Sequence, residues 1–156
     1  MIKLLRVDDR LLHGQISTYW VEYLKIDRIY VINDEVCHDE FSKMALSLAK
    51  PKHIEVCFYE LKEGIEQLIN DQTSDARVLA IVNCMSDALH VLTTVTGIHS
   101  LNIGGLRAVP GVESTRISGS VMMSDQDIAV CRLLSNQGVQ IEIRQIPGEK
   151  ATIVNF

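Results

Sequence analysis

One histidine near the N-terminus stands among the residue types that phosphoryl chemistry requires. His13 belongs to the stretch Arg6-Val7-Asp8-Asp9-Arg10-Leu11-Leu12-His13-Gly14-Gln15, which also holds two arginines and two aspartates. The guanidinium groups of Arg6 and Arg10 carry forked N–H donors that suit phosphate oxygens. A neutral imidazole is well populated near neutral pH and can act as a nucleophile. The stretch therefore indicates a histidine that accepts a phosphoryl group and holds it covalently.

The residues on either side predict how this histidine is positioned. An apolar run from Ile2 to Val7 indicates a strand, and the residues after Gly14 show the three- and four-residue apolar spacing of a helix, with Ile16, Tyr19, Trp20, Tyr23 and Leu24 on its apolar side. His13 then lies at the carboxyl end of a strand, where open α/β sheets bind ligands. Because the first N–H groups of a helix lack partners inside it, those of Gly14, Gln15 and Ile16 are expected to be unpaired, close to His13 and available to bind an anion. Gly14 also leaves room for a group on the imidazole.

Strand-like and helix-like segments alternate along the remaining sequence. The expected strands are 29–32, 54–58, 77–82, 100–103, 117–123 and 139–144, and the expected helices are 39–48, 61–69, 86–94 and 124–135. Such alternation implies right-handed βαβ units. We therefore expect a single α/β domain over residues 1–156, an open, mostly parallel sheet of six to seven strands with helices on both faces.

Composition and charge narrow the class of protein. The chain of 156 residues is 47 % apolar, 22 % charged and carries a net charge of −5, which argues against general binding to nucleic acid or to an anionic membrane. No apolar run reaches the length of a membrane span. The N-terminus turns acidic at Asp8, too early for a signal peptide. We expect a cytoplasmic protein that meets a membrane only through its partners.

Two other kinds of phosphate protein fit the residues poorly. A response-regulator receiver domain needs an aspartate at the end of the third strand and a lysine after the fifth. Here those places hold Cys57-Phe58-Tyr59-Glu60 and Gly104-Gly105-Leu106-Arg107. Neither a P-loop nor a dinucleotide fingerprint is present, so a kinase that uses ATP directly is not indicated. Any phosphate is therefore expected to arrive on another protein.

The remaining reactive residue types suggest no metal or cofactor. The cysteines Cys37, Cys57, Cys84 and Cys131 are scattered, which predicts buried free thiols instead of a zinc site or disulfides. The other four histidines have no second ligand three or four residues away. Tyr19 and Trp20 are expected in the core. Gly104-Gly105 is expected either to line the cleft beside His13 or to form a tight turn, and the loop 106–116 is a candidate docking surface.

The stretch 6–15 resembles the signature of the IIB components of sorbose/mannose-type phosphotransferase (PTS) sugar transporters. Similar motifs follow in order along essentially the whole chain: Trp20, 33–36, 39–41, 48–51, 101–105, 138–141 and Pro147. Two places depart from the family pattern, Lys50 and the pair Cys37-His38. Both lie outside the active loop, so they leave the resemblance intact there.

This resemblance implies a protein-phosphohistidine–sugar phosphotransferase component. A partner IIA protein would pass its phosphoryl group to Nδ1 of His13, which would pass it to a sugar carried by the membrane subunits IIC and IID. Arg10 matches the arginine that faces the phosphate. Gly14, Gln15, Arg6 and Asp8 are the other residues expected at the phosphate site, with no metal or cofactor.

A second hypothesis is that the chain catalyses no reaction and is an α/β module that binds an anion at the same helix N-terminus. Phosphorylation of His13 distinguishes the two. The sequence does not identify the sugar among mannose, fructose, sorbose and N-acetylgalactosamine, and it leaves open whether the chain is a monomer or a homodimer.

Overall fold

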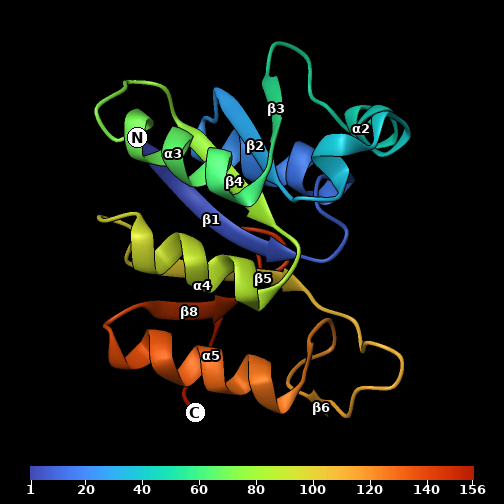
Figure 1. Cartoon of the computed structure of the whole chain (residues 1–156), viewed down its shortest axis with the longest axis vertical. Helices are drawn as coiled ribbons and strands as arrows, with labels where there is room; N and C mark the ends of the chain where they lie inside the picture. Colours follow the sequence, from blue (N-terminus) through green and yellow to red (C-terminus); the bar gives the residue numbers. More distant parts are fainter.

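A seven-stranded sheet forms the centre of the molecule (Figure 1). The computed structural model describes all residues from Met1 to Phe156. The strands lie in the order β3-β2-β4-β1-β5-β8-β9, with β9 antiparallel to β8 and all other pairs parallel. Their bounds are β1 Ile2–Asp8, β2 Arg28–Ile32, β3 Glu55–Tyr59, β4 Val78–Val82, β5 Ser100–Gly105, β8 Gln140–Ile143 and β9 Thr152–Ile153. A separate antiparallel pair is formed by β6 Thr115–Arg116 and β7 Met122–Met123.

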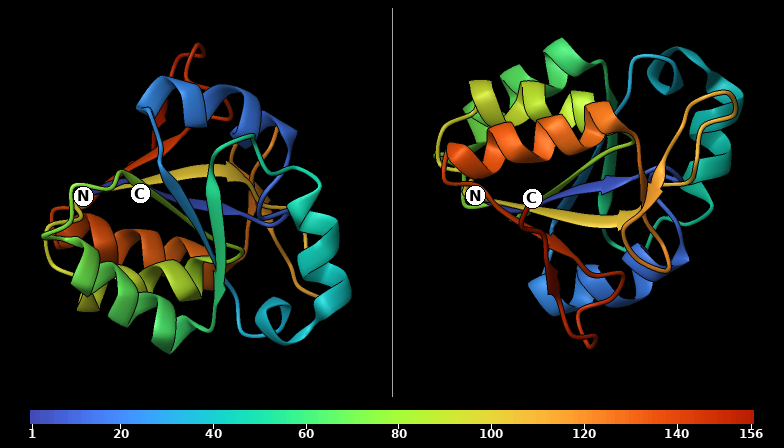
Figure 2. Two further views of the ribbon diagram at one scale, coloured as in Figure 1. Left: turned by 90° about the horizontal axis from the view of Figure 1, so that it is seen from above. Right: turned by 90° about the horizontal axis from the view of Figure 1, so that it is seen from below.

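Helices cover both faces of the sheet, as expected (Figure 2). One face carries three helices, α3 Leu61–Asp71, α4 Met85–Thr94 and α5 Asp125–Asn136. The other face carries a π-helical turn, η1 Ile16–Trp20, which continues into α1 Val21–Leu24. Two further helices, the 3-10 turn η2 Val36–His38 and α2 Glu40–Ser47, follow β2. In Figure 2 α2 lies beyond the carboxyl ends of the strands.

The side chains of β1 explain why the sheet has two separate cores. Successive residues of a strand point to opposite faces, and Leu5 and Val7 pack into the core beneath α3, α4 and α5. Leu4, on the alternate face, packs against the core around Trp20. Arg6 and Asp8 belong to this second face by the same alternation, and both are fully buried. Two charged side chains therefore enter an otherwise apolar layer.

Local signals account for how several elements begin. Asp39 caps α2 by accepting hydrogen bonds from the backbone N–H groups of Phe41 and Ser42. Ser124 and Asp127 form a capping box at the start of α5. Both helices begin within a residue or two of the positions expected from the sequence.

The structure corrects some of the sequence predictions. The continuous strand expected over 117–123 is wrong, because the chain bends at Ser118-Gly119-Ser120. Only Met122–Met123 form a strand, paired with β6, while Val121 makes a single bridge to Leu106. Gly104 and Gly105 extend β5 instead of following it, and the short strand β9 was not expected. Tyr19 is 48 % exposed, whereas Trp20 is buried as expected. Of the four cysteines, only Cys131 is buried; the others are partly exposed. None of the helices combines the length and apolar character needed to cross a bilayer.

Candidate active site

His13 is held by a buried carboxylate at the end of β1. Its Nε2 lies 2.8 Å from Oδ2 of Asp8, and the side chain of His13 is 14 % exposed while that of Asp8 is fully buried. Burial acts to raise the pKa of Asp8, but the hydrogen bond with His13 and the charge of Arg6 outweigh it and hold the pKa below its ordinary value. Asp8 is therefore ionised at neutral pH.

An ionised carboxylate can only accept hydrogen bonds, and this fixes the tautomer of the imidazole. Nε2 of His13 must carry the proton that it shares with Asp8. In the neutral ring, Nδ1 then carries the lone pair. Nδ1 makes no hydrogen bond within the protein, so the nucleophilic nitrogen is the unoccupied one.

The loop from β1 to the helix is anchored at its middle. Leu11 and Leu12 are buried in the core around Trp20, and Leu11 takes a left-handed backbone conformation with φ of 57°. Such a conformation costs about 1–2 kcal/mol for a residue with a Cβ, so packing must hold it in place. Two leucines thus fix the path of the chain that presents His13.

The helix starts directly after this histidine. The carbonyl oxygen of His13 accepts from the N–H groups of Ile16 and Ser17, at 3.1 Å each. The N–H groups of Gly14 and Gln15 have no partner within the chain, and a Cβ added to Gly14 would meet nothing within 4 Å. Two free donors and open space therefore lie next to the imidazole. The sequence predicted a third free N–H at Ile16, and this is wrong, because the first turn of the helix closes onto the carbonyl oxygen of His13.

Arg10 lies on the solvent side of Asp8. Its backbone N–H donates to Oδ1 of Asp8 at 3.1 Å, and its Nη2 donates to Oε1 of Gln15 at 3.2 Å. The Arg10 side chain is 44 % exposed. An accessible cation is thus held by contacts with Asp8 and Gln15, the residues on either side of His13.

Arg6 lies beneath Asp8, away from solvent. Its Nη2 donates to Oδ2 of Asp8 at 2.9 Å, the same oxygen that faces His13. Its Nη1 donates to Oδ1 of Asn102 at 2.7 Å and to the carbonyl oxygens of Arg144 and Gln145. The guanidinium also lies 5.7 Å from the centre of the Trp20 ring. Burial lowers the pKa of Arg6, and the charge and hydrogen bond of Asp8 act against that shift.

Gly104 makes room for this buried guanidinium. A Cβ at that position would lie 1.8 Å from Nη2 of Arg6, which no rearrangement of a buried side chain can accommodate easily. Gly104 therefore neither lines an open cleft nor forms a turn, the two roles considered for it from the sequence.

The four residues expected to bind phosphate thus separate into two layers. Gly14 and Gln15 face the open space, as does Arg10. Arg6 and Asp8 lie behind the imidazole, where their side chains are fully buried, so this arrangement assigns them to holding His13 instead of contacting a phosphate. The sequence contained a signal for this difference, because residues two apart in a strand share a face.

Arg107 is a cation beside the loop that carries His13. The sequence assigned Arg107 only to a possible docking surface, the loop 106–116. Its backbone N–H and its Nε both donate to Oδ2 of Asp9 at 2.8 Å, and this partner raises the pKa of Arg107. Asp9 in turn donates its N–H to the carbonyl oxygen of Gly105 at 3.0 Å. The loop after β5 is therefore joined to the loop that carries His13.

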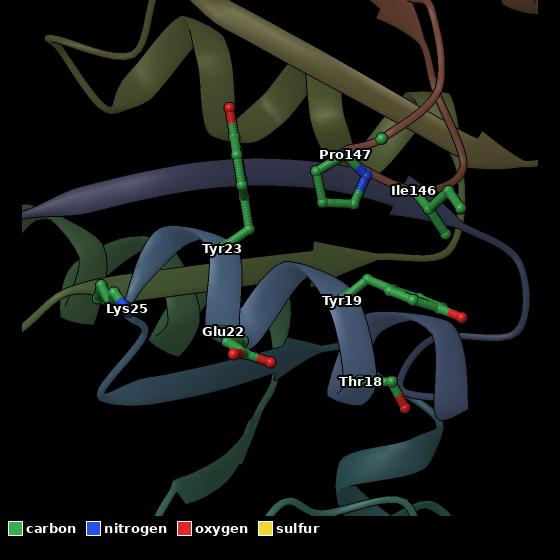
Figure 3. A pocket seen from close by; sticks show the side chains of 8 residues that line it. Thr18, Tyr19, Glu22, Tyr23, Lys25, Ile146 and Pro147 are labelled. Atoms are coloured by element: carbon green, nitrogen blue, oxygen red, sulfur yellow. The ribbon is translucent and has the colours of Figure 1, made fainter.

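The largest cleft of the molecule lies elsewhere. It has a volume of about 580 Å³ and is open along η1, α1 and the segment after β8 (Figure 3), where its lining residues are Thr18, Tyr19, Glu22, Tyr23, Lys25, Ile146, Pro147 and Gly148. No residue of the His13 loop lines it. The site at His13 is separate from this cleft and reaches the surface at Arg10, whose side chain is 44 % exposed.

One group of side chains could hold a metal ion, and it lies on other loops. Cys37, His38 and Glu60 bring a sulfur, a nitrogen and an oxygen within 4.8 Å of one another. The spacing of residues within single segments did not predict this group, because Glu60 follows β3 whereas Cys37 and His38 follow β2. The adjacent Cys37-His38 pair was the only sequence signal.

Comparisons with known proteins identify the family of the chain. The model of the family described as "PTS system sorbose subfamily IIB component" matches residues 2–155. The sorbose-specific EIIB component of Klebsiella pneumoniae is 32 % identical over 148 residues, covering 95 % of this chain and 89 % of that protein. The mannose-specific EIIAB component of Escherichia coli strain K12 is 28 % identical; the match covers 94 % of this chain and 45 % of that protein.

A solved structure is similar over almost its full length. The crystal structure of the IIBSor domain of the sorbose permease from Klebsiella pneumoniae matches with a TM-score of 0.88 and 31 % identity. The match covers 97 % of this chain and 92 % of that domain. The open α/β sheet expected from the sequence is therefore confirmed.

The substitution Gly104→Ala should destabilise the fold by displacing Arg6 from Asp8. Disrupting a buried ion pair costs about 3–5 kcal/mol, and the free energy of unfolding from urea denaturation measures it. Gly119→Ala is the matched control, because a Cβ there meets nothing within 4 Å and the change should stay within about 0.5 kcal/mol. Equal unfolding midpoints for the two variants would show that Arg6 does not need this cradle.

Stability in acid should depend on the contact between Asp8 and His13. The pKa of Asp8 is lowered in the folded chain, so Asp8 contributes stability that is complete above its unfolded pKa of about 3.9 and is lost as the pH falls through the folded value. His13→Gln removes the imidazole hydrogen bond and should raise the folded pKa, leaving less stability to lose between about pH 5 and about pH 2.

Urea unfolding across this range checks the expectation, with His99→Gln, an exposed histidine elsewhere, as the control. Parallel pH curves for the wild type and His13→Gln would mean that the imidazole does not lower the pKa of Asp8.

Proposed function

Because the chain belongs to the sorbose-type family of IIB components, the phosphotransferase subunits of sugar PTS transporters, we propose that His13 is the residue that carries the phosphoryl group. The observation that carries this assignment is the contact of 2.8 Å between Nε2 of His13 and the ionised, buried Asp8. It leaves Nδ1 as the free nucleophile. We therefore assign the phosphoryl group to Nδ1.

In the first transfer, phospho-IIA is the donor. The lone pair of Nδ1 attacks phosphorus in line with the N–P bond of the donor histidine; a new N–P bond forms on His13, and the donor imidazole leaves with the electrons of the old bond. Positive charge develops on the His13 ring as Nδ1 gives up its lone pair. Asp8 stabilises that charge through Nε2–H, as a carboxylate does for an imidazolium in a catalytic triad.

The group being transferred needs donors in front of the ring. Its oxygens carry negative charge throughout, and catalysis of phosphoryl transfer consists mainly of positioning and electrostatic stabilisation. The free N–H groups of Gly14 and Gln15 and the guanidinium of Arg10 supply both. Arg6 and Asp8 are positioning residues, since neither reaches the open side.

In the second transfer the acceptor is a sugar hydroxyl. Its oxygen attacks phosphorus, the bond from phosphorus to Nδ1 breaks, and the sugar leaves as its phosphate ester while its hydroxyl proton passes to a base. The membrane subunits IIC and IID would present the sugar, and the proposal places the chain at their cytoplasmic side. A relative named as a mannose-specific EIIAB component joins the donor and acceptor parts in one chain, which supports a IIA protein as donor.

The alternative of a non-catalytic anion-binding module is not favoured, because the family to which the chain belongs consists of phosphotransferase components. A free helix N-terminus alone would serve that alternative. An anion-binding module does not explain why a buried carboxylate is directed at Nε2 of His13.

Phosphorylation can be measured directly. The full chain, incubated with phosphoenolpyruvate, the general PTS proteins and a cognate IIA, should gain one acid-labile, base-stable phosphate on Nδ1 of His13, identified by ³¹P NMR. His13→Ala should remain unlabelled, whereas His99→Gln should label like the wild type. A wild type that stays unlabelled beside an active IIA would contradict the proposal, and labelling at Nε2 would contradict the role given to Asp8.

Arg10→Ala should slow transfer and leave the fold nearly unchanged. Loss of one preorganised donor to a transition-state oxyanion costs about 10²–10³-fold in rate, and quenched-flow labelling by phospho-IIA measures it. The exposed Arg10 side chain makes only weak contacts, so the free energy of unfolding should change by less than about 1 kcal/mol. A large fall in stability with an unchanged transfer rate would make Arg10 a structural residue.

A further inference from the structure

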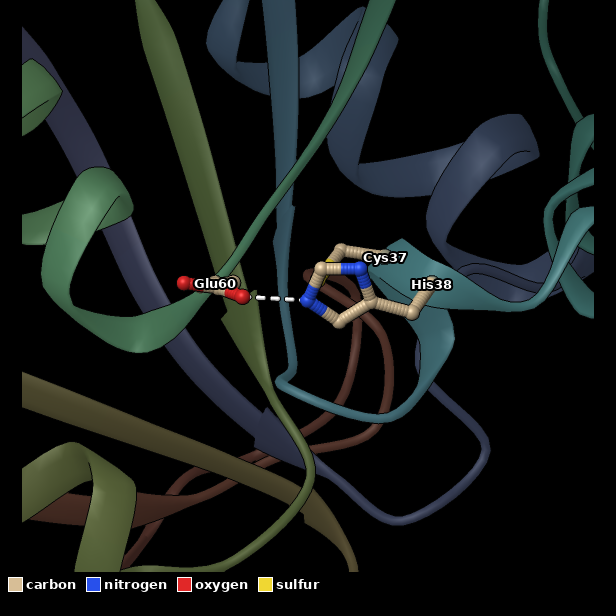
Figure 4. Close-up of side chains that lie close together, drawn as sticks. All are labelled: Cys37, His38 and Glu60. Carbon is tan, nitrogen blue, oxygen red and sulfur yellow. Dashed lines mark hydrogen bonds and ion pairs between the residues drawn. The ribbon is translucent and has the colours of Figure 1, made fainter.

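Three side chains with metal-binding atoms meet at the end of the sheet where β2 and β3 finish (Figure 4). Cys37 and His38 belong to η2, and Glu60 directly follows β3. Sγ of Cys37, a ring nitrogen of His38 and a carboxylate oxygen of Glu60 all lie within 4.8 Å of one another. We propose that this Cys-His-Glu cluster binds a divalent transition-metal ion of the zinc type.

The two loops that carry the cluster are fixed by hydrogen bonds that do not involve its members. The side chain of Asn33 accepts from the N–H groups of Glu35 and Val36, which shapes the turn into η2. Oδ1 of Asp34 accepts from the N–H of Leu61 at 2.7 Å, which joins this turn to the start of α3. The backbone thus brings the ligands together before any ion binds, and little ordering is left for the ion to impose.

The donor set selects the class of ion. A thiolate is a soft ligand that Mg²⁺ and Ca²⁺ avoid, whereas Zn²⁺ accepts sulfur, nitrogen and carboxylate oxygen together. Bonds of about 2.0–2.3 Å in a tetrahedron place ligand atoms about 3.3–3.8 Å apart, so a separation of at most 4.8 Å needs only side-chain rotation. With three protein ligands, water would fill the fourth position.

Accessibility and charge also favour a cation here. The side chains of His38 and Glu60 are 69 % and 48 % exposed, so an ion can reach them. Burial raises the pKa of the Cys37 thiol, and the negative charges of Glu60, Asp34 and Glu63 raise it further, whereas Lys43 lowers it. Lys43 itself is paired with Glu40 at 3.3 Å. Acidic groups therefore outnumber the single cation around the cluster.

The cluster lies outside the machinery of phosphoryl transfer. It follows β2 and β3, while His13 follows β1, and β4 separates β2 from β1. At about 4.8 Å between strands, this places the cluster about 10–15 Å along the same edge of the sheet. A bound ion would join η2 to the start of α3 without touching the residues that hold His13.

Without an ion, the simplest role of these residues is a surface ion pair between His38 and Glu60, which contact each other directly. That pair would not involve the thiol of Cys37. A spectroscopic signal from sulfur bound to metal therefore separates the two possibilities.

The full chain, stripped with a chelator and kept reduced, should bind one Co²⁺ per molecule, with thiolate-to-cobalt charge-transfer absorption and the visible bands of a tetrahedral ion. Zn²⁺ should displace Co²⁺ and raise the melting temperature as its concentration rises above the dissociation constant. Cys37→Ser should abolish the charge-transfer band. His38→Gln and Glu60→Gln should each weaken binding by at least about tenfold, since loss of even an outer-sphere partner has that effect.

Two control variants keep the result specific. Cys57→Ser removes another partly exposed thiol and His99→Gln another exposed imidazole, and both should bind Co²⁺ as the wild type does. The proposal is overturned if the wild type shows no charge-transfer band, if Cys37→Ser keeps it, or if the controls lose binding as strongly as the cluster variants. Circular dichroism of each variant without metal excludes unfolding as the cause of a loss.

Discussion

The orientation of His13 depends on the buried ion pair between Arg6 and Asp8. Arg6 and Asp8 enter the apolar layer around Trp20 from the same face of β1, and burying two charges is costly unless each is paired and hydrogen-bonded. Arg6 meets this requirement with Asp8, Asn102 and two backbone carbonyls. Asp8 meets it with Arg6, the N–H of Arg10 and the imidazole of His13. His13 thus completes the hydrogen bonding of a carboxylate that the fold already had to satisfy, and its orientation follows from that.

This arrangement suits a site that must meet two partners in turn. Residues in the interior set the direction of the imidazole, so the surface around Nδ1 is left free for whichever protein docks there. Arg10, Gln15 and the free N–H groups of Gly14 and Gln15 are polar groups that the loop offers beside His13. A site of this kind lets the donor leave after transfer, in keeping with the small interfaces of transient complexes.

The sequence predicted the order of elements well, because alternating apolar patterns and helix caps are local signals. It placed His13 between β1 and the helix and predicted the free donors at Gly14 and Gln15. It gave Arg10 the role of facing the phosphate and also expected Arg6 at the phosphate site, although the alternation of side chains along β1 places Arg6 on the buried face with Asp8. The sequence did not predict contacts between distant segments, namely the space that Gly104 leaves for Arg6, Arg107 beside Asp9, and Glu60 beside Cys37-His38. The sequence also did not predict the exposure of Tyr19. The spacing of apolar residues shows which side of a helix faces the sheet, but it does not show how much of that side the sheet covers.

The carbonyl oxygens of Arg144 and Gln145 that hold Arg6 come from the segment between β8 and β9. On the ribosome, the support beneath His13 is translated more than a hundred residues after the histidine itself. A nascent chain that has not yet released β8 and β9 would leave Arg6 with part of its hydrogen bonds unmade. The support beneath His13 is therefore completed only after the segment between β8 and β9 has been synthesised, long after the histidine itself.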